Sequence, residues 1–155
     1  MGQIVHFGLG NFARAHLLDY TADAGGRWQV IGVNLRSSAT RDGLAAQDYA
    51  YALNVQGTGI KQITGLKTIL LASEGQQPIF EAMKNADIIS ATVTEKGYHL
   101  DQNGQLDLQD PVIATELAGP PLRSLIGFIA HGLTLRHRPV TILSCDNRVG
   151  NGDAL

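Results

Sequence analysis

The sequence has little cysteine and no long apolar run. Cys145 is the only cysteine among 155 residues, so no disulfide forms within the chain. That usage is typical of a reducing compartment, and we expect a cytoplasmic protein. No stretch approaches the roughly 20 apolar residues of a transmembrane helix, and the first residues lack the charged and apolar regions of a signal peptide. We therefore expect no membrane partner.

Strong charge and metal-ligand clusters are also missing. The formal net charge is -2 at pH 7, and the longest basic cluster, 136–138, is too short for a polybasic arm. We therefore expect no nucleic-acid partner, because proteins that bind nucleic acid usually carry a basic patch. The five histidines are scattered, and neither they nor the cysteine show the spacing of metal ligands, so we expect no metal site.

What the sequence does contain is alternating strand and helix patterns. Hydrophobic residues make up 44% of the chain, enough for a core. Apolar strands are predicted at 4–7, 28–33, 88–94 and 140–144. Helices are predicted after residue 10, with Phe12, Ala15, Leu18 and Ala22 on one face and Gly25-Gly26 at the end, and at 37–48, 78–84 and 120–135. Turns are predicted in 99–118, at Asn103-Gly104 and Asp110-Pro111.

The order of these elements predicts an α/β fold. Strands that alternate with helices favour a doubly wound, mostly parallel sheet of the Rossmann type. Segments 49–55 and 60–71, joined by 56–59, predict an antiparallel excursion from it. We expect residues 1–155 to form one such domain.

A glycine motif follows the first strand. Gly8-Leu9-Gly10-Asn11-Phe12-Ala13 fits the dinucleotide fingerprint G-x-G-x-x-A. Gly8 permits a tight turn, Gly10 lets a pyrophosphate approach the backbone, and Ala13 lets the helix pack closely. Phosphate would then rest on the helix N-terminus, near Arg14 and His16. The alternative is a plain glycine turn between strand and helix.

The acid that normally binds the adenosine ribose is missing after the second strand. Asn34 stands in its place and can bond a ribose hydroxyl. Arg36 or Arg41 can face a 2′-phosphate, or face solvent. A dinucleotide is therefore the expected cofactor, and these residues leave the choice between NAD and NADP open.

Polar residues follow two further strands. Thr94 and Glu95 are candidates for the nicotinamide end, and Asn147 or Asn151 can hold an oxyanion without titrating. Lys96 is a candidate acid/base, although a solvated loop lysine is the commoner case. Cys145 lacks a partnering base and fits a small buried residue better than a nucleophile.

The glycine motif extended to Arg14-Ala15-His16 resembles the opening of the mannitol dehydrogenase family of polyol dehydrogenases, which includes fructuronate and tagaturonate reductases. The stretches 33–37, 92–98, 144–147 and 150–152 resemble that family in the same order. The resemblance implies a Rossmann domain, preference for NAD, and metal-free interconversion of a polyol or sugar acid and its ketose. It implies that Asn147 holds the substrate oxygen.

The resemblance also implies a helical C-terminal domain with a catalytic lysine in a Lys-x-x-x-x-Asn-x-x-His pattern. The sequence contains no such pattern, so we expect a truncated or split protein that lacks the main catalytic lysine and is inactive alone. An apolar face left by that domain is expected to make the chain self-associate.

Two other readings stay open. One is a methyltransferase on a related sheet, against which Asn34 and Ala13 both argue. The other is a non-catalytic module that binds NAD(H), or a subunit that needs another chain.

Overall fold

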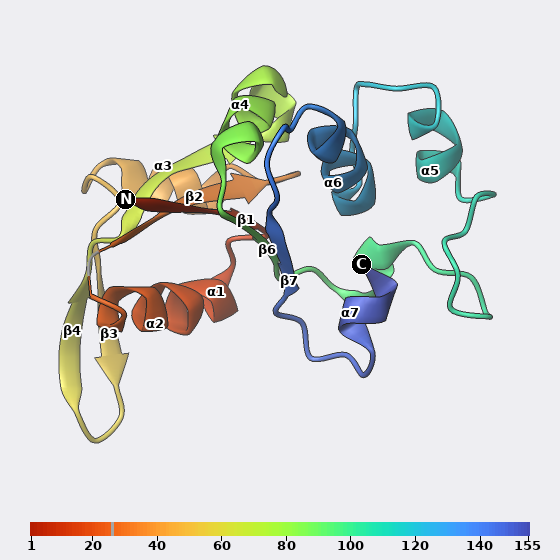
Figure 1. The fold of residues 1–155 in the computed structure, drawn as a ribbon. Helices are drawn as coiled ribbons and strands as arrows, with labels where there is room; N and C mark the ends of the chain where they lie inside the picture. Colours follow the sequence, from red (N-terminus) through yellow and green to blue (C-terminus); the bar gives the residue numbers. More distant parts are fainter. Residues whose placement is uncertain (26) are drawn as a thin grey trace.

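A five-stranded parallel sheet forms the centre of the computed structural model, which describes residues 1–25 and 27–155 (Figure 1). The strand order is β5-β2-β1-β6-β7, and every neighbouring pair is parallel. The strands are β1 (Gly2–Phe7), β2 (Trp28–Asn34), β5 (Leu66–Leu71), β6 (Ile88–Ala91) and β7 (Thr141–Ser144). The predicted doubly wound, mostly parallel sheet is therefore confirmed.

Helices cover both faces of this sheet. In Figure 1, α1 (Asn11–Ala15) and α2 (Leu17–Asp23) lie below it, and α4 (Gln77–Asn85) and α6 (Leu125–Thr134) lie above it. Alternate residues of β1 enter the two cores: Val5 and Phe7 pack in the cluster that includes α4 and α6, and Ile4 packs with α1 and α2. Burial on both faces explains why most residues of β1 and β2 are apolar.

The topology fixes where a ligand would bind. The chain leaves β1 to one side for β2 and β5, and returns to the other side for β6 and β7. The connections therefore diverge at the carboxyl ends of β1 and β6, which is where open α/β sheets bind ligands.

The antiparallel excursion is shorter than predicted. Strands β3 (Tyr51–Val55) and β4 (Gly59–Ile63) form the predicted antiparallel pair, with Val55 opposite Gly59. The extension of that excursion to residue 71 was wrong, because Gly65 separates β4 from β5, which joins the main sheet beside β2. The buried Leu66, Ile69 and Leu71 explain this, since the main core offers them more burial than a hairpin would.

The first helix differs from its predicted pattern. It is interrupted at His16, and the buried positions on it are Ala13, Leu18 and Thr21. Phe12 was predicted on the buried face, but it is 56% exposed. Gly25 follows α2 with a φ of 86°, as a glycine after a helix end commonly does, and the predicted stop at Gly26 lies outside the described residues.

The helices of the second half also depart from prediction. The helix predicted from Pro120 begins only at Leu125, because the residue before a proline avoids the helical conformation and Ser124 caps the helix by accepting from Gly127 N. Where a turn was predicted, Asp110 instead caps α5 (Pro111–Glu116). The glycine-rich end carries α7 (Asn151–Ala154), and the remaining helices are α3 (Ala39–Ala45) and two 3-10 turns, η1 (Ala72–Glu74) and η2 (Glu95–Tyr98).

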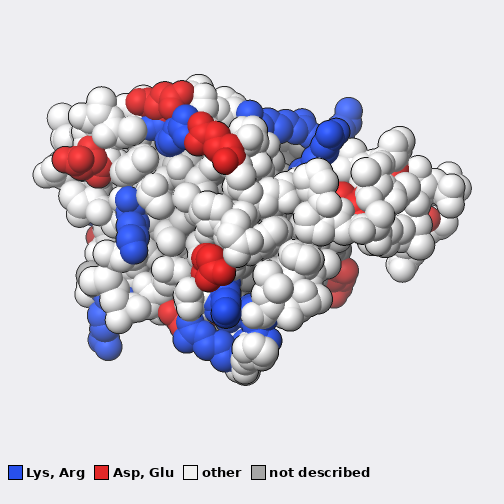
Figure 2. All heavy atoms as spheres, turned by 90° about the horizontal axis from the view of Figure 1, so that it is seen from above, with Lys and Arg blue, Asp and Glu red and all other residues white. Residues whose placement is uncertain are grey.

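The surface is mixed in charge on the face shown in Figure 2. Lysine and arginine side chains lie there in separate groups, with aspartate and glutamate side chains between them. None of the helices described has both the length and the apolar character needed to cross a bilayer.

Candidate functional site

The turn after β1 is built around Gly8. Its φ of 84° lies in the left-handed region, and its N–H donates to Val33 O at 2.8 Å. A Cβ at this position would lie 2.1 Å from the carbonyl oxygen of Thr92, which is backbone and cannot move aside freely. The fold itself therefore requires glycine at Gly8, as the sequence pattern predicted.

Gly10 is different, because the fold does not require it to be glycine. It stands before the first residue of α1 with a φ of -90°, which any residue adopts. A Cβ on Gly10 would find, among the described residues beyond its chain neighbours, only the Gly8 oxygen within 4 Å, at 3.9 Å. The space over this backbone is therefore open, and a side chain would fill it. Ala13, one turn later, is fully buried and lets α1 lie close to the sheet.

Asn34 braces the glycine loop. Its Oδ1 accepts from the N–H of Leu9 at 3.0 Å, and its Nδ2 donates to Ser37 O at 3.5 Å. The oxygen therefore faces the loop, and the amide nitrogen is the group left to face a ligand. The side chain predicted to bind a ribose thus also holds the end of β2 against the loop.

A cavity of about 470 Å³ lies over the glycine loop. It brings together six residues predicted from the sequence: Gly8, Gly10, Asn34, Arg36, Thr94 and Lys96. Its other lining residues, which sequence reasoning had not singled out, are Leu9, Leu35, Ser37, Thr40, Val93 and Gly97. The cavity is therefore formed by the carboxyl ends of β1, β2 and β6, where the topology predicted it.

Other predicted contacts lie beside this cavity. Asn11 accepts from Arg14 Nη2 at 2.5 Å, and the Phe12 ring lies on His16 with 4.5 Å between ring centroids. Arg41 pairs with Glu74 at 2.5 Å and does not line the cavity. Of the two candidate arginines, only Arg36 reaches the cavity.

A second cavity, of about 380 Å³, adjoins the first. Val93 and Thr94 line both, and the second also contains Glu95, Asn147 and Arg148. Asn147 is exposed there, within the loop that joins β7 to α7. The structure therefore brings the predicted oxyanion residue next to the predicted nicotinamide contacts.

Hydrogen bonds hold the loop that carries Asn147. The buried Tyr98 hydroxyl donates to Asp146 Oδ2 at 2.6 Å and lies 2.6 Å from Ser144 Oγ. Burial, and then the hydrogen bond to the Asp146 carboxylate, raise the pKa of Tyr98 to about 12. Asn151 donates from Nδ2 to Asp146 O at 2.8 Å, so it braces the loop. Sequence reasoning missed Tyr98, because nothing in its local pattern indicates a partner 48 residues away.

The remaining candidates are less embedded. Lys96 is exposed at the rim of the first cavity. Arg148, which sequence reasoning missed, lies over the Tyr98 ring at 5.8 Å, and its Nη1 is 3.8 Å from Glu95 Oε1. Burial raises the pKa of the Cys145 thiol, which opposes formation of a nucleophilic thiolate and fits a small packed residue.

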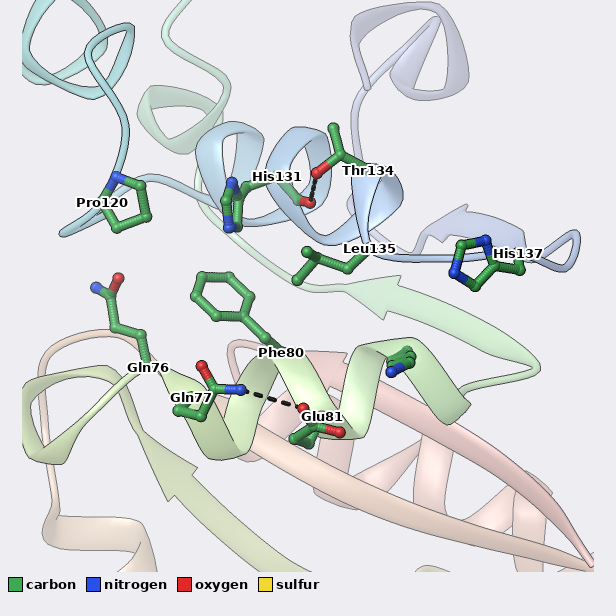
Figure 3. A pocket seen from close by; sticks show the side chains of 10 residues that line it. Gln76, Gln77, Phe80, Glu81, Pro120, His131, Thr134, Leu135 and His137 are labelled. Carbon is green, nitrogen blue, oxygen red and sulfur yellow. Dashed lines mark hydrogen bonds between the residues drawn. The ribbon is translucent and has the colours of Figure 1, made fainter.

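A further cavity of about 610 Å³ lies between α4 and α6 and shares no lining residue with the two above. Figure 3 shows Phe80 and His131 facing each other there, with 4.7 Å between ring centroids. It lies on the helical layer and has no glycine loop. In the part of the chain described, no three histidine, cysteine or acidic side chains gather where they could hold a metal ion.

Comparison with known proteins identifies a family. The family model described as the mannitol dehydrogenase Rossmann domain matches residues 2–155. A mannitol 2-dehydrogenase of Pyrenophora tritici-repentis is 36% identical, over 97% of this chain and 30% of its own length. The D-mannonate oxidoreductase of Escherichia coli is 37% identical, over 97% of this chain and 35% of its own.

Solved structures agree with this. The ternary complex of Pseudomonas fluorescens mannitol 2-dehydrogenase with NAD and D-mannitol matches with a TM-score of 0.87 and 34% identity, over 99% of this chain and 35% of that one. A substrate-free D-sorbitol dehydrogenase matches with a TM-score of 0.89 and 29% identity, over 97% of this chain and 35% of that one. The chain thus spans about a third of the length of these relatives. It belongs to the mannitol dehydrogenase family and corresponds to that family's Rossmann domain.

Proposed function

We propose that the chain binds NAD(H) in the cavity over the glycine loop. The observation that carries this proposal is the open space at Gly10, where the fold has no need for glycine but a pyrophosphate does. The first N–H groups of α1 point out of the N-terminal end of the helix, and no side chain of the described residues caps them. Backbone N–H groups in this arrangement favour an anion.

We propose NAD rather than NADP as the better ligand. A single arginine near the ribose can accommodate a 2′-phosphate, and of the two candidate arginines only Arg36 lines the cavity, so NADP is the alternative ligand. Asn34 presents an uncharged amide there, which neither repels a phosphate strongly nor attracts it. The complex of the Pseudomonas fluorescens relative contains NAD, which supports the same choice.

We propose that the whole enzyme interconverts a polyol or a sugar acid, of the mannitol or mannonate type, and its ketose. NAD would supply the hydride acceptor. Asn147 would donate from its amide to the substrate oxygen, and the loop bonds of Tyr98 and Asn151 would keep it in place. Thr94 and Glu95 would lie beside the nicotinamide, in the cavity that they share with Asn147.

We propose further that residues 1–155 are the cofactor domain and that the main acid/base comes from elsewhere. Lys96 is exposed, and the sequence lacks the Lys-x-x-x-x-Asn-x-x-His pattern that the family resemblance implies. A helical substrate domain outside these residues would supply that base and most of the substrate contacts. The chain alone would then bind cofactor without turnover.

Titration of the purified chain with NADH and NADPH by calorimetry tests these proposals. Fructose and fructuronate are then added, and the nicotinamide absorbance is followed. Cofactor binding without turnover is expected, with NADH tighter. Failure to bind either cofactor would contradict the binding proposal, and robust turnover would contradict the missing base and make Lys96 the next residue to substitute.

An exposed edge supports a second proposal, that this chain self-associates. β7 is the last strand of the sheet, and Leu143 on it is 45% exposed. An unpaired strand edge with an exposed leucine is a site where another strand can add. Of the two rival functions, a non-catalytic NAD(H)-binding module and a subunit that needs another chain, only the second predicts a stable complex of defined size. Sedimentation over a range of concentrations distinguishes that complex from weak self-association.

For the compartment we propose the cytoplasm, supported by the lone, half-buried Cys145 and tested by cell fractionation.

A further inference from the structure

A buried histidine lies under the glycine loop and has no part in the function proposed above. His6 is on β1 and is fully buried, and Ser90, its register partner on β6, is 1% exposed. The His6 ring reaches two hydroxyl groups: Nδ1 lies 2.9 Å from Ser90 Oγ, and Nε2 lies 2.9 Å from Thr92 Oγ1. Buried polar groups normally require partners, and both ring nitrogens have one here.

The Thr92 hydroxyl fixes the direction of these hydrogen bonds. Thr92 Oγ1 lies 2.8 Å from Gly8 O, and only the hydroxyl can donate between these two oxygens. The single hydroxyl proton of Thr92 is therefore committed to Gly8 O. Thr92 Oγ1 must then accept from His6, so Nε2 carries the ring proton and Nδ1 accepts from Ser90.

The hydrogen bonds that run from His6 through Thr92 end on the peptide group between Gly8 and Leu9, which shapes the glycine loop. The carbonyl oxygen of Gly8 accepts from Thr92 on the β6 side and from Gly10 N at 2.7 Å. The N–H of the same peptide group belongs to Leu9 and donates to Asn34 at 3.0 Å on the β2 side. Because a trans peptide is planar and its C=O and N–H point in opposite directions, the two contacts fix the rotation of this peptide plane.

We propose that His6 is a positioning residue for the cofactor loop: its neutral Nε2–H tautomer directs the Thr92 hydroxyl onto Gly8 and so sets the peptide plane beside the open space at Gly10. This proposal rests on the proposed binding of NAD(H). It assigns His6 no contact with the cofactor, and it gives Thr92 the role of an intermediary.

The environment of His6 keeps this tautomer available. Burial lowers the pKa of His6 to about 4, and a backbone hydrogen bond at Gly8 opposes this to a smaller extent, so the ring is neutral at neutral pH. A second ring proton on Nδ1 would also displace the hydroxyl proton of Ser90, for which no other acceptor is found in the described part of the chain. The neutral ring and the ordered hydroxyls therefore stabilise each other.

Two variants of the full chain separate the two ring nitrogens. A glutamine amide reaches about as far as imidazole Nε2, so His6→Gln keeps a donor for Thr92 and loses the bond to Ser90. An asparagine amide reaches about as far as Nδ1, so His6→Asn keeps the bond to Ser90 and loses the donor for Thr92. His137→Asn, an exposed position outside both cavities of the site, is the control.

Calorimetric titration with NADH gives the first readout. We expect His6→Asn to weaken binding about tenfold, as loss of one buried donor does, and His6→Gln and the control to stay within about twofold of the unchanged chain. Thermal unfolding of each variant is measured alongside, because a merely structural role would make affinity follow stability. Equal weakening in both His6 variants would overturn the proposal.

Nitrogen chemical shifts of the imidazole in the unchanged chain give a second readout that needs no variant to fold. We expect the Nε2–H pattern with and without NADH, and an Nδ1–H pattern would refute the relay. If the unchanged chain binds no NADH, the proposed function fails and the role of His6 in binding fails with it. The observed tautomer of His6 would still show the direction of the hydrogen bonds, independently of cofactor binding.

Discussion

Exchange of Gly10 for alanine should separate cofactor binding from stability. The φ of -90° at Gly10 is allowed for alanine, and the new methyl group would meet only the Gly8 oxygen at 3.9 Å among the described residues that are not its chain neighbours. The free energy of unfolding should therefore change by less than about 0.5 kcal/mol, as for most unstrained surface changes. The methyl group would nevertheless occupy the space proposed for the pyrophosphate.

The expected loss of affinity follows from that overlap. Forcing a methyl group into a filled space typically costs about 1–3 kcal/mol, which corresponds to a roughly 5- to 150-fold weaker Kd for NADH. Gly8→Ala is the matched comparison, because its φ of 84° and the Thr92 oxygen at 2.1 Å both oppose a side chain. That variant should lose at least about 2 kcal/mol of stability, or about 4–8 °C in Tm for a domain of this size.

Calorimetry with NADH and thermal unfolding by circular dichroism measure the two quantities. Gly10→Ala is expected to unfold at nearly the original Tm and to bind NADH weakly. Unchanged NADH affinity in Gly10→Ala would refute the position of the pyrophosphate. A fall in Tm as large as that of Gly8→Ala would instead show that Gly10 is needed by the fold.

Four further changes test other parts of the structure. Ala13→Leu should lower stability by about 1–3 kcal/mol in thermal unfolding, because Ala13 is fully buried between α1 and the sheet. Arg36→Glu should weaken NADPH binding more than NADH binding in parallel titrations, and equal effects would remove Arg36 from the ribose end. In the Tyr98→Phe variant, the free energy of unfolding should fall less between pH 10 and 12 than in the unchanged chain. The raised pKa of about 12 means that the stability from protonated Tyr98 is complete below pH 10 and is lost as pH rises through 12. Leu143→Lys should reduce concentration-dependent self-association in sedimentation experiments, and no change would move that contact away from β7.

The sheet was predictable because its signals are local. Mostly apolar runs such as 28–33 are typical of strands that are covered on both faces, and the pair Gly8 and Gly10 is typical of the turn between a strand and a helix that binds a dinucleotide. The failures came from competition between local pattern and tertiary burial. Residues 66–71 fit a hairpin by position, but a place beside β2 buries three of their side chains. Phe12 fitted an apolar helical face, but the smaller Ala13 lies against the sheet, and the helix is rotated accordingly.

The site was predictable only in part, for a related reason. Residues at the ends of strands converge by topology, so the gathering of Asn34, Thr94 and Asn147 at two adjoining cavities could be predicted from the order of the elements. Partners that are far apart in sequence carry no such signal, as with Tyr98 and Asp146, 48 residues apart. Arg148 was missed for the same reason, since its contacts with Tyr98 and Glu95 appear only when two loops meet.

The two glycines of the glycine loop have two different explanations. Gly8 is required by the backbone, because its φ and the approach of β6 leave no room for a side chain. The described residues place neither constraint on Gly10, which fits the proposal that a ligand approaches the backbone there. The peptide between Gly8 and Leu9 is held from β6 by Thr92 and from β2 by Asn34, so the loop is fixed by both neighbours of β1. A loop fixed in this way needs little rearrangement when an anion binds, so the cost of ordering it on cofactor binding should be small.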